Sequence, residues 1–426
     1  MKDQAPTGHR GSGDSKRSPM GPARTRHVRA LAPLMAVFLS AGLSTAIAAP
    51  FLTLFLTSTV HASPVRLSLF LLAQPVCGIA ASTLMGRLSD RRFPRRHMLM
   101  LAAFGGAAGC ASFAVVRNYW LLLALGCTVF AVGGALSAQG FAYARAILAG
   151  DPSAALATST LRTCFSVAWV AGPPLASVLL TAGGFRWLYL TAAAFYAVVI
   201  AIGAFWLKEP PSITPAATDR TALHGHPPEV GRRTLWLTLA GIALVNSSLN
   251  VNVQAMALHV RHDLHGGAGA AGLILGLCAA LEIPLMLSFG VLSTRMPLWH
   301  LVRLGPIFGV AYFLVAATAT SVWELAAAQL LNACYIAIIA GLAISYVQEL
   351  LPTQPGRAST LYSNARPFGA ILASPVLGLG ASYSYRLPYA AGIVLAGAGL
   401  ILLTAGANSR RRSTPAVATE QIHTFI

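Results

Sequence analysis

The chain has 426 residues, 56% of them hydrophobic and only 10% charged, whereas soluble proteins carry about 25% charged residues, so the composition excludes a soluble class. The formal net charge is +18, from 30 Lys and Arg against 12 Asp and Glu. Because the basic residues fall mainly at the termini and between apolar runs, we interpret them as topology signals and contacts with the lipid bilayer, and not as a nucleic-acid surface.

The chain begins with a polar segment, residues 1–28, that is rich in Gly, Pro and Ser and carries several basic residues. We interpret this segment as a disordered basic cytoplasmic tail. A basic stretch before an apolar run can also be a signal peptide. Here the apolar run continues through residues 51–56 and further runs follow, which favours an uncleaved first helix.

Apolar segments long enough to cross a bilayer then follow one another along the chain. The first set lies near 31–56, 66–86, 98–116, 119–144, 158–182 and 187–207. A polar cytoplasmic linker follows, over 208–234. The second set lies near 235–258, 269–293, 298–318, 322–347, 358–380 and 387–406, before a cytoplasmic tail at 408–426. The pattern predicts an all-α integral membrane protein of about twelve transmembrane helices, in two six-helix bundles over 29–207 and 235–407.

A cluster of arginines fixes the expected orientation of these helices. Residues 86–96 separate two apolar runs and contain Asp90 and five arginines. Short arginine-rich loops stay on the cytoplasmic side of the membrane during insertion. The other gaps on the same side hold Arg145, Arg232, Arg233, Arg295, Arg357 and the triplet 410–412. We therefore expect a protein of the cell membrane with both of its termini in the cytoplasm.

The two halves also share short sequence echoes. These are Ser-Thr-Leu at 159–161 and 359–361, Pro152 and Pro352, and Gly-x-Leu-Ser at 86–89 and 290–293. Each echo falls at an equivalent place in its half, so we predict a parallel internal repeat with pseudo-two-fold symmetry. In transporters with such repeats the substrate site lies between the halves, near the middle of the membrane.

Several segments resemble known families. The Gly-x-x-x-Asp-Arg loop of Gly86, Asp90 and Arg91, after the second span, resembles the gating loop of the major facilitator superfamily. The segments 49–56, 168–176, 281–284, 348–352 and 357–364 resemble the bacterial sugar efflux transporter family. The resemblance implies export of sugars or small glycosides, with the proton as coupling ion. Where members of that family can carry an acidic residue at the end of the seventh span, this chain has Gln254.

The seventh span carries the densest uncharged polarity. Asn246, Asn250 and Gln254 are spaced i, i+4 and i+8, which places them on one stripe of a helix. Amides offer both donors and acceptors, which suits a substrate rich in hydroxyl groups. The alternative is hydrogen bonding between helices, but three amides in one stripe favour a substrate-binding role.

Charged residues inside the predicted spans are the candidates for proton coupling. Glu282 lies in the middle of the eighth span, where a carboxyl group must be paired, hydrated or protonated. Proton coupling and substrate binding are both open for it, against a fixed ion pair between helices. Arg162 and Arg366, in the fifth and eleventh spans, also require polar partners. Arg145 and Glu349 lie at span ends, and we assign them to gating or topology.

The remaining predicted substrate contacts are polar residues of other spans: Gln139 and Tyr143 on the fourth, Asn332 and Tyr335 on the tenth, and Asn364 on the eleventh. Aromatic rings can stack on sugar CH groups while amides bind the hydroxyls. The chain has no phosphate-binding loop and no zinc or hydrolase motif, and its six cysteines form no close pair. We therefore expect a monomeric transporter without cofactor or metal, and not an enzyme. A drug antiporter on the same scaffold and, more remotely, a membrane sensor are the alternatives.

Overall fold

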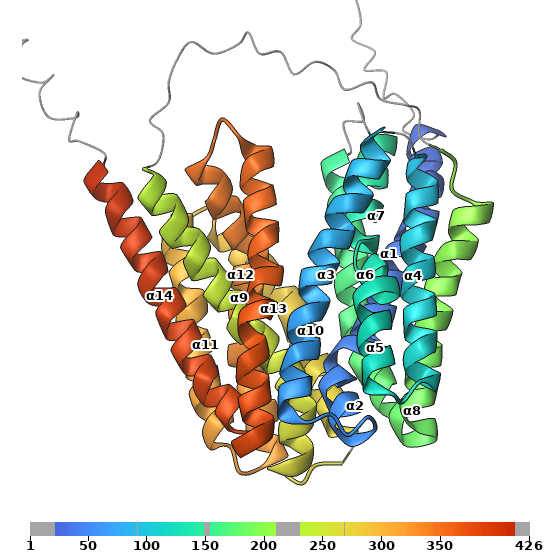
Figure 1. Cartoon of the computed structure of the whole chain (residues 1–426). Helices are drawn as coiled ribbons and strands as arrows, with labels where there is room; N and C mark the ends of the chain where they lie inside the picture. Colours follow the sequence, from blue (N-terminus) through green and yellow to red (C-terminus); the bar gives the residue numbers. More distant parts are fainter. Residues whose placement is uncertain (1–21, 92, 149–153, 210–230, 268, 414–426) are drawn as a thin grey trace, which may run out of the picture.

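The computed structural model describes residues 22–91, 93–148, 154–209, 231–267 and 269–413, and all regular structure in these ranges is helical (Figure 1). Most of the predicted terminal tails and of the predicted linker lies outside the described residues. At the edges of the tails the structure is helical, because α1 begins at Pro22, inside the tail predicted as disordered, and α14 continues to Ser413. Within the described part, ten helical stretches are long and apolar enough to cross a membrane. This confirms the predicted all-α, multi-pass membrane class.

The helices follow the predicted spans closely. Those of the first half are α1 (Pro22–Ala48), η1 (Ala49–Phe51), α2 (Leu52–Ser58), α3 (Pro64–Arg91), α4 (Arg95–Val115), α5 (Tyr119–Leu125), η2 (Gly126–Phe130), α6 (Ala131–Gly133), α7 (Leu136–Ile147) and α8 (Ala154–Phe205). Those of the second half are α9 (Arg232–His262), α10 (Ala270–Leu292), α11 (Leu298–Thr318), α12 (Val322–Leu350), α13 (Pro355–Tyr383) and α14 (Leu387–Ser413). With 29 residues, α13 is long enough to span a membrane but is too polar to count among the ten apolar stretches.

Local breaks divide some of these helices. The 52-residue α8 is two helices joined at Gly183 and Gly184, and Gly184 has a φ of 67°, a left-handed conformation that favours glycine. The first span turns into a short 3-10 segment at Pro50, which has no N–H to donate to a helix. The fourth span contains a π-helical turn, η2, between α5 and α6.

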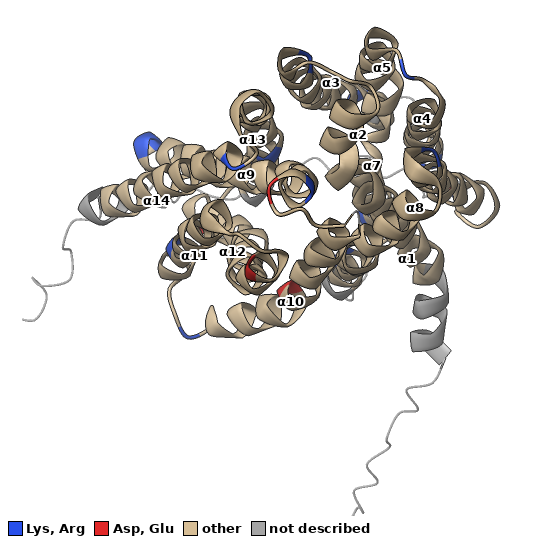
Figure 2. Ribbon diagram, turned by 90° about the horizontal axis from the view of Figure 1, so that it is seen from below, with Lys and Arg blue, Asp and Glu red and all other residues tan. Residues whose placement is uncertain are grey.

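Figure 1 shows two groups of helices that converge at their lower ends and separate toward their upper ends. The helices α1 to α8 form the first group and α9 to α14 form the second. The groups meet where α3 packs against α13, where α8 packs against α10, and where η1 and α2 pack against α9. Seen from below, α13 lies next to α3 and α10 lies toward α8 (Figure 2).

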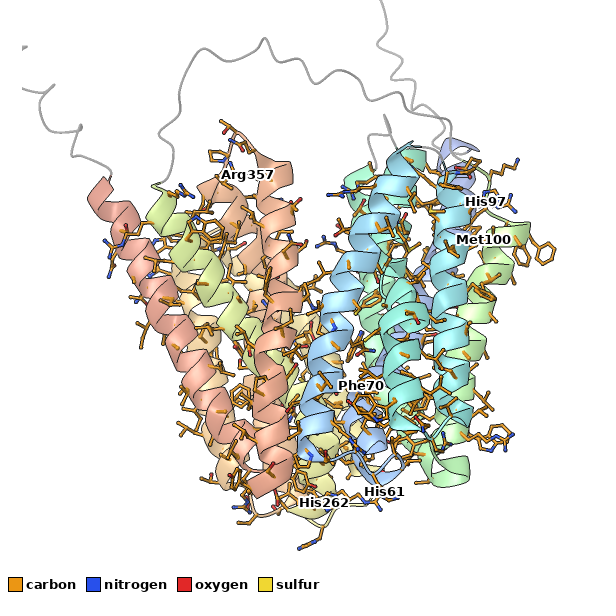
Figure 3. All side chains as sticks on the ribbon, in the orientation of Figure 1. His61, Phe70, His97, Met100, His262 and Arg357 are labelled. Carbon is orange, nitrogen blue, oxygen red and sulfur yellow. The ribbon has the colours of Figure 1, made fainter. Side chains whose placement is uncertain are left out.

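Glycines bring the two groups into close contact at the lower side. A Cβ atom at Gly272 of α10 would collide with Pro173 and Ser177 of α8, and one at Gly378 of α13 would collide with Ser68 of α3. Gly272 is near the start of α10 and Gly378 near the end of α13, so both contacts lie in the lower half. Figure 3 places His61 and His262 at this end, and His97 and Arg357 at the opposite end. The molecule is therefore closed below and separated above.

The interior of the first group is held by a cluster of aromatic rings. The ring centroids of Phe55 and Tyr189 are 5.0 Å apart, and those of Phe113 and Tyr189 are 5.4 Å apart. Phe113 also stacks near Phe55 and Phe130, with centroid distances of 6.2 and 5.3 Å. These contacts join α2, α4, η2 and α8, and they pack the lower part of the group as one aromatic core.

Candidate functional site

A cavity of about 270 Å³ lies between the two groups, just above the lower contacts. The first group lines it with Leu71, Gln74, Pro75, Gly78, Phe130, Ala131 and Gly134, and the second with Asn250, Gln254, Ala370, Ala373 and Leu377. Its wall is thus mostly apolar with three amide side chains, Gln74, Asn250 and Gln254. Small-molecule sites have this composition, because a few polar groups fix the orientation of a ligand that apolar groups bury.

Two of the three amides predicted on the seventh span line this cavity. Asn250 Nδ2 donates to the carbonyl oxygen of Asn246 at 2.8 Å. Gln254 Oε1 accepts a hydrogen bond of 2.7 Å from Thr53 Oγ1 of α2, so that this amide joins the two groups. Asn246 itself is buried, donates to the carbonyl of Ile242 and packs against Gly369 of α13. The structure therefore brings Asn250 and Gln254 to the cavity and places Asn246 in the contact between α9 and α13.

Asn332 lies in a buried hydrogen-bond network inside the second group. Its Nδ2 donates to Gln329 Oε1 at 2.9 Å and approaches Cys278 Sγ at 3.2 Å. Tyr312 extends the network, because its hydroxyl donates to Asn252 Oδ1 at 2.7 Å and lies 3.4 Å from Gln329 Nε2. The network ties α9 to α10, α11 and α12, and so holds the helix that carries Asn250 and Gln254.

Tyr335 has a similar position in the second group. Its fully buried hydroxyl lies 2.8 Å from Ser248 Oγ and donates to the carbonyl oxygen of Val245 at 3.2 Å. The ring also fills the space beside Gly309, where a Cβ atom would collide with it. Asn332 and Tyr335 are thus held within the second group, and neither lines the cavity.

The predicted residues of the fourth span lie inside the first group. Gln139 is 4% exposed, and its neighbour Gly140 packs against the ring of Phe38. Tyr143 is fully buried, and its hydroxyl donates to the carbonyl oxygen of Lys208 at 2.6 Å. This bond attaches α7 to the end of the first group, at the upper side, away from the cavity described above.

The charged candidates lie on α8, α10 and α13, which take part in the contacts between the two groups. Glu282 of α10 is half-buried and interacts electrostatically with Arg366 of α13. Arg162 of α8 is exposed and lies over the ring of Phe141, with its guanidinium carbon 5.7 Å from the ring centroid. Both arginines interact electrostatically with Tyr362, whose hydroxyl donates to the carbonyl oxygen of Ile339. Few acidic residues are marked on the described helices in Figure 2, so Glu282 is a rare acidic residue in this region.

The predicted gating loop is described only in part. Gly86 lies on α3, whereas the side chains of Asp90 and Arg91 lie outside the described residues. Arg145 is exposed, and its Nε is 3.4 Å from the carbonyl oxygen of Phe141. Glu349 and Asn364 are exposed on α12 and α13. The structure thus places Arg145 and Glu349 near the upper ends of their helices, as predicted for residues at span ends.

Glu209 makes a contact that the sequence did not predict. Its carboxylate accepts hydrogen bonds from the backbone N–H groups of Arg95, at 2.6 Å, and Arg96, at 3.2 Å. These are the first residues of α4, where N–H groups lack helical partners and the helix dipole favours a negative charge. The Arg96 side chain in turn donates to the carbonyl oxygens of Gly203 and Ala204. A lone acidic residue directly after the sixth apolar run was the available signal.

These features define a multi-pass membrane transporter: two groups of helices, closed on one side, around a small cavity with polar amides. The family model of the major facilitator superfamily matches residues 34–374. The chain therefore belongs to the major facilitator superfamily, and it is a transporter and not an enzyme.

Curated relatives and solved structures agree with this assignment. The chain is 33% identical to sugar efflux transporter A of Dickeya chrysanthemi, over 87% of this chain and 93% of that protein. It is 30% identical to sugar efflux transporter C of Escherichia coli (strain K12), over 90% of this chain and 97% of that protein. The crystal structure of the nucleoside transporter NupG has the same fold, with a TM-score of 0.73, 13% identity and coverage of 89% and 98% of the two chains.

Proposed function

We propose that the protein exports sugars or small glycosides across the cytoplasmic membrane. The observation that carries this proposal is the pair of amides, Asn250 and Gln254, in a cavity of a chain similar to sugar efflux transporters along most of its length. Amides bind hydroxyl groups as donors and as acceptors. Apart from these two amides and Gln74 the cavity is lined by apolar residues, and Phe130 provides a ring on which CH groups of a sugar can rest. The substrate class is therefore neutral and hydroxylated.

The proposed topology has about twelve spans with both termini in the cytoplasm. The breaks in α8 and the length of α13 support this number of spans. The upper side of Figure 1 is then cytoplasmic, because Arg357 and the start of α4, which carries Arg95 and His97, lie there (Figure 3). On this assignment the two bundles are closed toward the outside and separated toward the cytoplasm. The protein acts as a monomer in the cell membrane.

The transport cycle is proposed to be alternating access, in which the two bundles rock about the cavity. Toward the outside, α8 meets α10 through Pro173 and Ser177 against Gly272. Spacings of three and four residues continue this face of α8 along the helix to Arg162. Closure of the cytoplasmic side therefore moves Arg162 toward α10, which carries Glu282. The outer contact between α8 and α10 opens in the same movement.

Glu282 is the proposed proton carrier. In the described state Arg366 supplies a positive charge near its carboxylate, and closure of the cytoplasmic side adds Arg162. A carboxyl group between two arginines of opposite bundles changes its electrostatic surroundings with the state of the transporter, which is the requirement for exchanging a proton against substrate. Arg162 and Arg366 are proposed to act as its ion-pair partners.

The test is counterflow of radiolabelled lactose and glucose, beside an apolar drug, in proteoliposomes with and without a pH gradient. We expect counterflow of at least one sugar, and faster efflux when protons can enter in exchange. Transport of the drug without either sugar would overturn the proposal in favour of a drug antiporter. A rate of sugar transport that does not change with the pH gradient would overturn the proton coupling alone.

A further inference from the structure

The two cavity amides of α9, Asn250 and Gln254, are not free to bind in every direction. They lie one helical turn apart on α9, so their side chains are neighbours on one face. Asn250 Nδ2 points to the backbone carbonyl oxygen of Asn246, at 2.8 Å. A carbonyl oxygen can only accept a hydrogen bond, so the NH₂ end of Asn250 is held there. Its Oδ1 atom is left as the acceptor for a ligand.

Gln254 has the opposite arrangement. Its Oε1 atom accepts the hydrogen bond of 2.7 Å from Thr53 Oγ1. Thr53 belongs to α2 in the first group and is 0% exposed, so this hydroxyl is fixed by the packing around it. The Nε2 group of Gln254 is left as the donor for a ligand. One turn of α9 therefore presents an acceptor at Asn250 and a donor at Gln254 to the cavity.

We propose that Asn250 Oδ1 and Gln254 Nε2 form a subsite for two neighbouring hydroxyl groups of a sugar ring, with Thr53 as its positioning residue. One hydroxyl donates to Asn250 Oδ1 and the other accepts from Gln254 Nε2. This inference rests on the proposed function, because it requires a hydroxylated substrate. Phe130, held by its ring contact with Phe113, lines the same cavity and limits the tilt of the bound ring.

The subsite depends on the state of the transporter because Thr53 and Gln254 come from opposite groups. Their hydrogen bond lies on the closed side, together with the contact of Gly378 with Ser68. Opening of this side separates the two groups and removes the bond that orients Gln254. The sugar then loses a fixed donor at the moment when the site faces outward. Substrate is bound more tightly from the cytoplasm than from outside, which suits export.

Thr53→Val tests this positioning role, because it removes the hydroxyl and keeps the shape of the side chain. The KM of the sugar is measured from the cytoplasmic face in inside-out vesicles and from the outer face in right-side-out vesicles. We expect the cytoplasmic KM to rise about three- to tenfold, the effect of one lost hydrogen bond. The outer KM should remain as in wild type. Equal shifts on both faces, or no shift, would overturn the positioning role.

Two further variants separate positioning from a loss of folding. Thr53→Ser retains the hydroxyl and should restore the wild-type cytoplasmic KM. Thr57→Val removes a hydroxyl one turn further along α2. This hydroxyl donates only to backbone carbonyl oxygens of its own helix, so the change should leave both KM values unchanged. Failure of Thr53→Ser to restore the KM, or a Thr57→Val effect as large as that of Thr53→Val, would also contradict the role.

Monodeoxy analogues of the transported sugar, glucose or lactose, test the subsite itself. Wild type should bind two of these analogues more weakly than the sugar itself. The hydroxyls that these two analogues lack should be neighbours on the sugar ring. Asn250→Ala should no longer discriminate against one of them, and Thr53→Val against the other. A wild type that carries sugar but binds all analogues equally would refute the subsite. A wild type that carries neither sugar would instead refute the proposed function, so the two failures are distinguishable.

Discussion

The interiors of the two groups of helices are held together by different kinds of contact. The first group is filled by rings, with Phe113 in contact with Phe55, Phe130 and Tyr189. The second is held by directional hydrogen bonds, among them Tyr312 to Asn252 and Asn332 to Gln329. Aromatic packing gives a stiff body, whereas directional hydrogen bonds between helices fix the rotation of the helices that contribute to them. The second group is therefore the one that can hold amides in a defined orientation toward a substrate.

The largest expected effect comes from breaking the aromatic side of this comparison. Phe113→Ala removes a ring at the centre of the cluster, where the side chain is 1% exposed. We expect a loss of about 3–5 kcal/mol of stability, from lost burial and the cavity left behind. Thermal and denaturant unfolding in detergent would measure it. Phe104→Ala on the same helix is the control, because Phe104 is 61% exposed, and a comparable loss there would contradict the assignment.

The next effect concerns charge at the boundary between the groups. Glu282→Gln removes the negative charge beside Arg366 and keeps the shape of the side chain. We expect efflux driven by a pH gradient to fall at least about tenfold, because the proposed proton carrier is lost. Sugar counterflow, which needs no proton movement, should persist. Glu324→Gln, at an exposed carboxylate bonded to the N–H of Thr320, should transport normally; full pH-driven efflux by Glu282→Gln would refute the coupling role.

The smallest expected effect comes from removing one buried tyrosine hydroxyl from each group and comparing the two losses of stability. Tyr312→Phe leaves Asn252 Oδ1 without its donor, and we expect a loss of about 1 kcal/mol of stability. Tyr189→Phe removes a buried hydroxyl that has no hydrogen-bond partner in the described residues. That change should be neutral or stabilising in the same unfolding assay. Equal losses in the two variants would mean that the polar network does not distinguish the groups.

Hydropathy made the helices predictable, because a bilayer-spanning segment must be apolar along its whole length. The predicted range 298–318 coincides with α11, and 119–144 covers α5, α6 and most of α7, which ends at Ile147. The number of spans, the symmetry and the location of the termini stay predictions. The break at Gly183 and Gly184 also fell between two predicted spans, since paired glycines tolerate a left-handed turn.

Side-chain neighbours were harder to predict, and the seventh span shows why. With 3.6 residues per turn, positions i and i+8 differ by about 80° around a helix. Gln254 and Asn250 therefore line the cavity, while Asn246 has rotated toward Gly369 of α13. Thr53 lies in the segment 49–56 that resembles the sugar efflux family, but nothing in the sequence pairs it with Gln254, which is 201 residues away. Only the packing of one group on the other brings that hydroxyl to Gln254.

The closed side of the molecule has one more consequence. Its described contacts include Gly272 against Pro173 and Ser177, Gly378 against Ser68, and the neutral hydrogen bond from Thr53 to Gln254. None of these pairs carries a formal charge, and dissolved ions screen only charges. In the proposed cycle, the equilibrium between the inward-open and outward-open states is thus set by the close packing of helices at small residues. This equilibrium is largely independent of the ionic strength outside the cell.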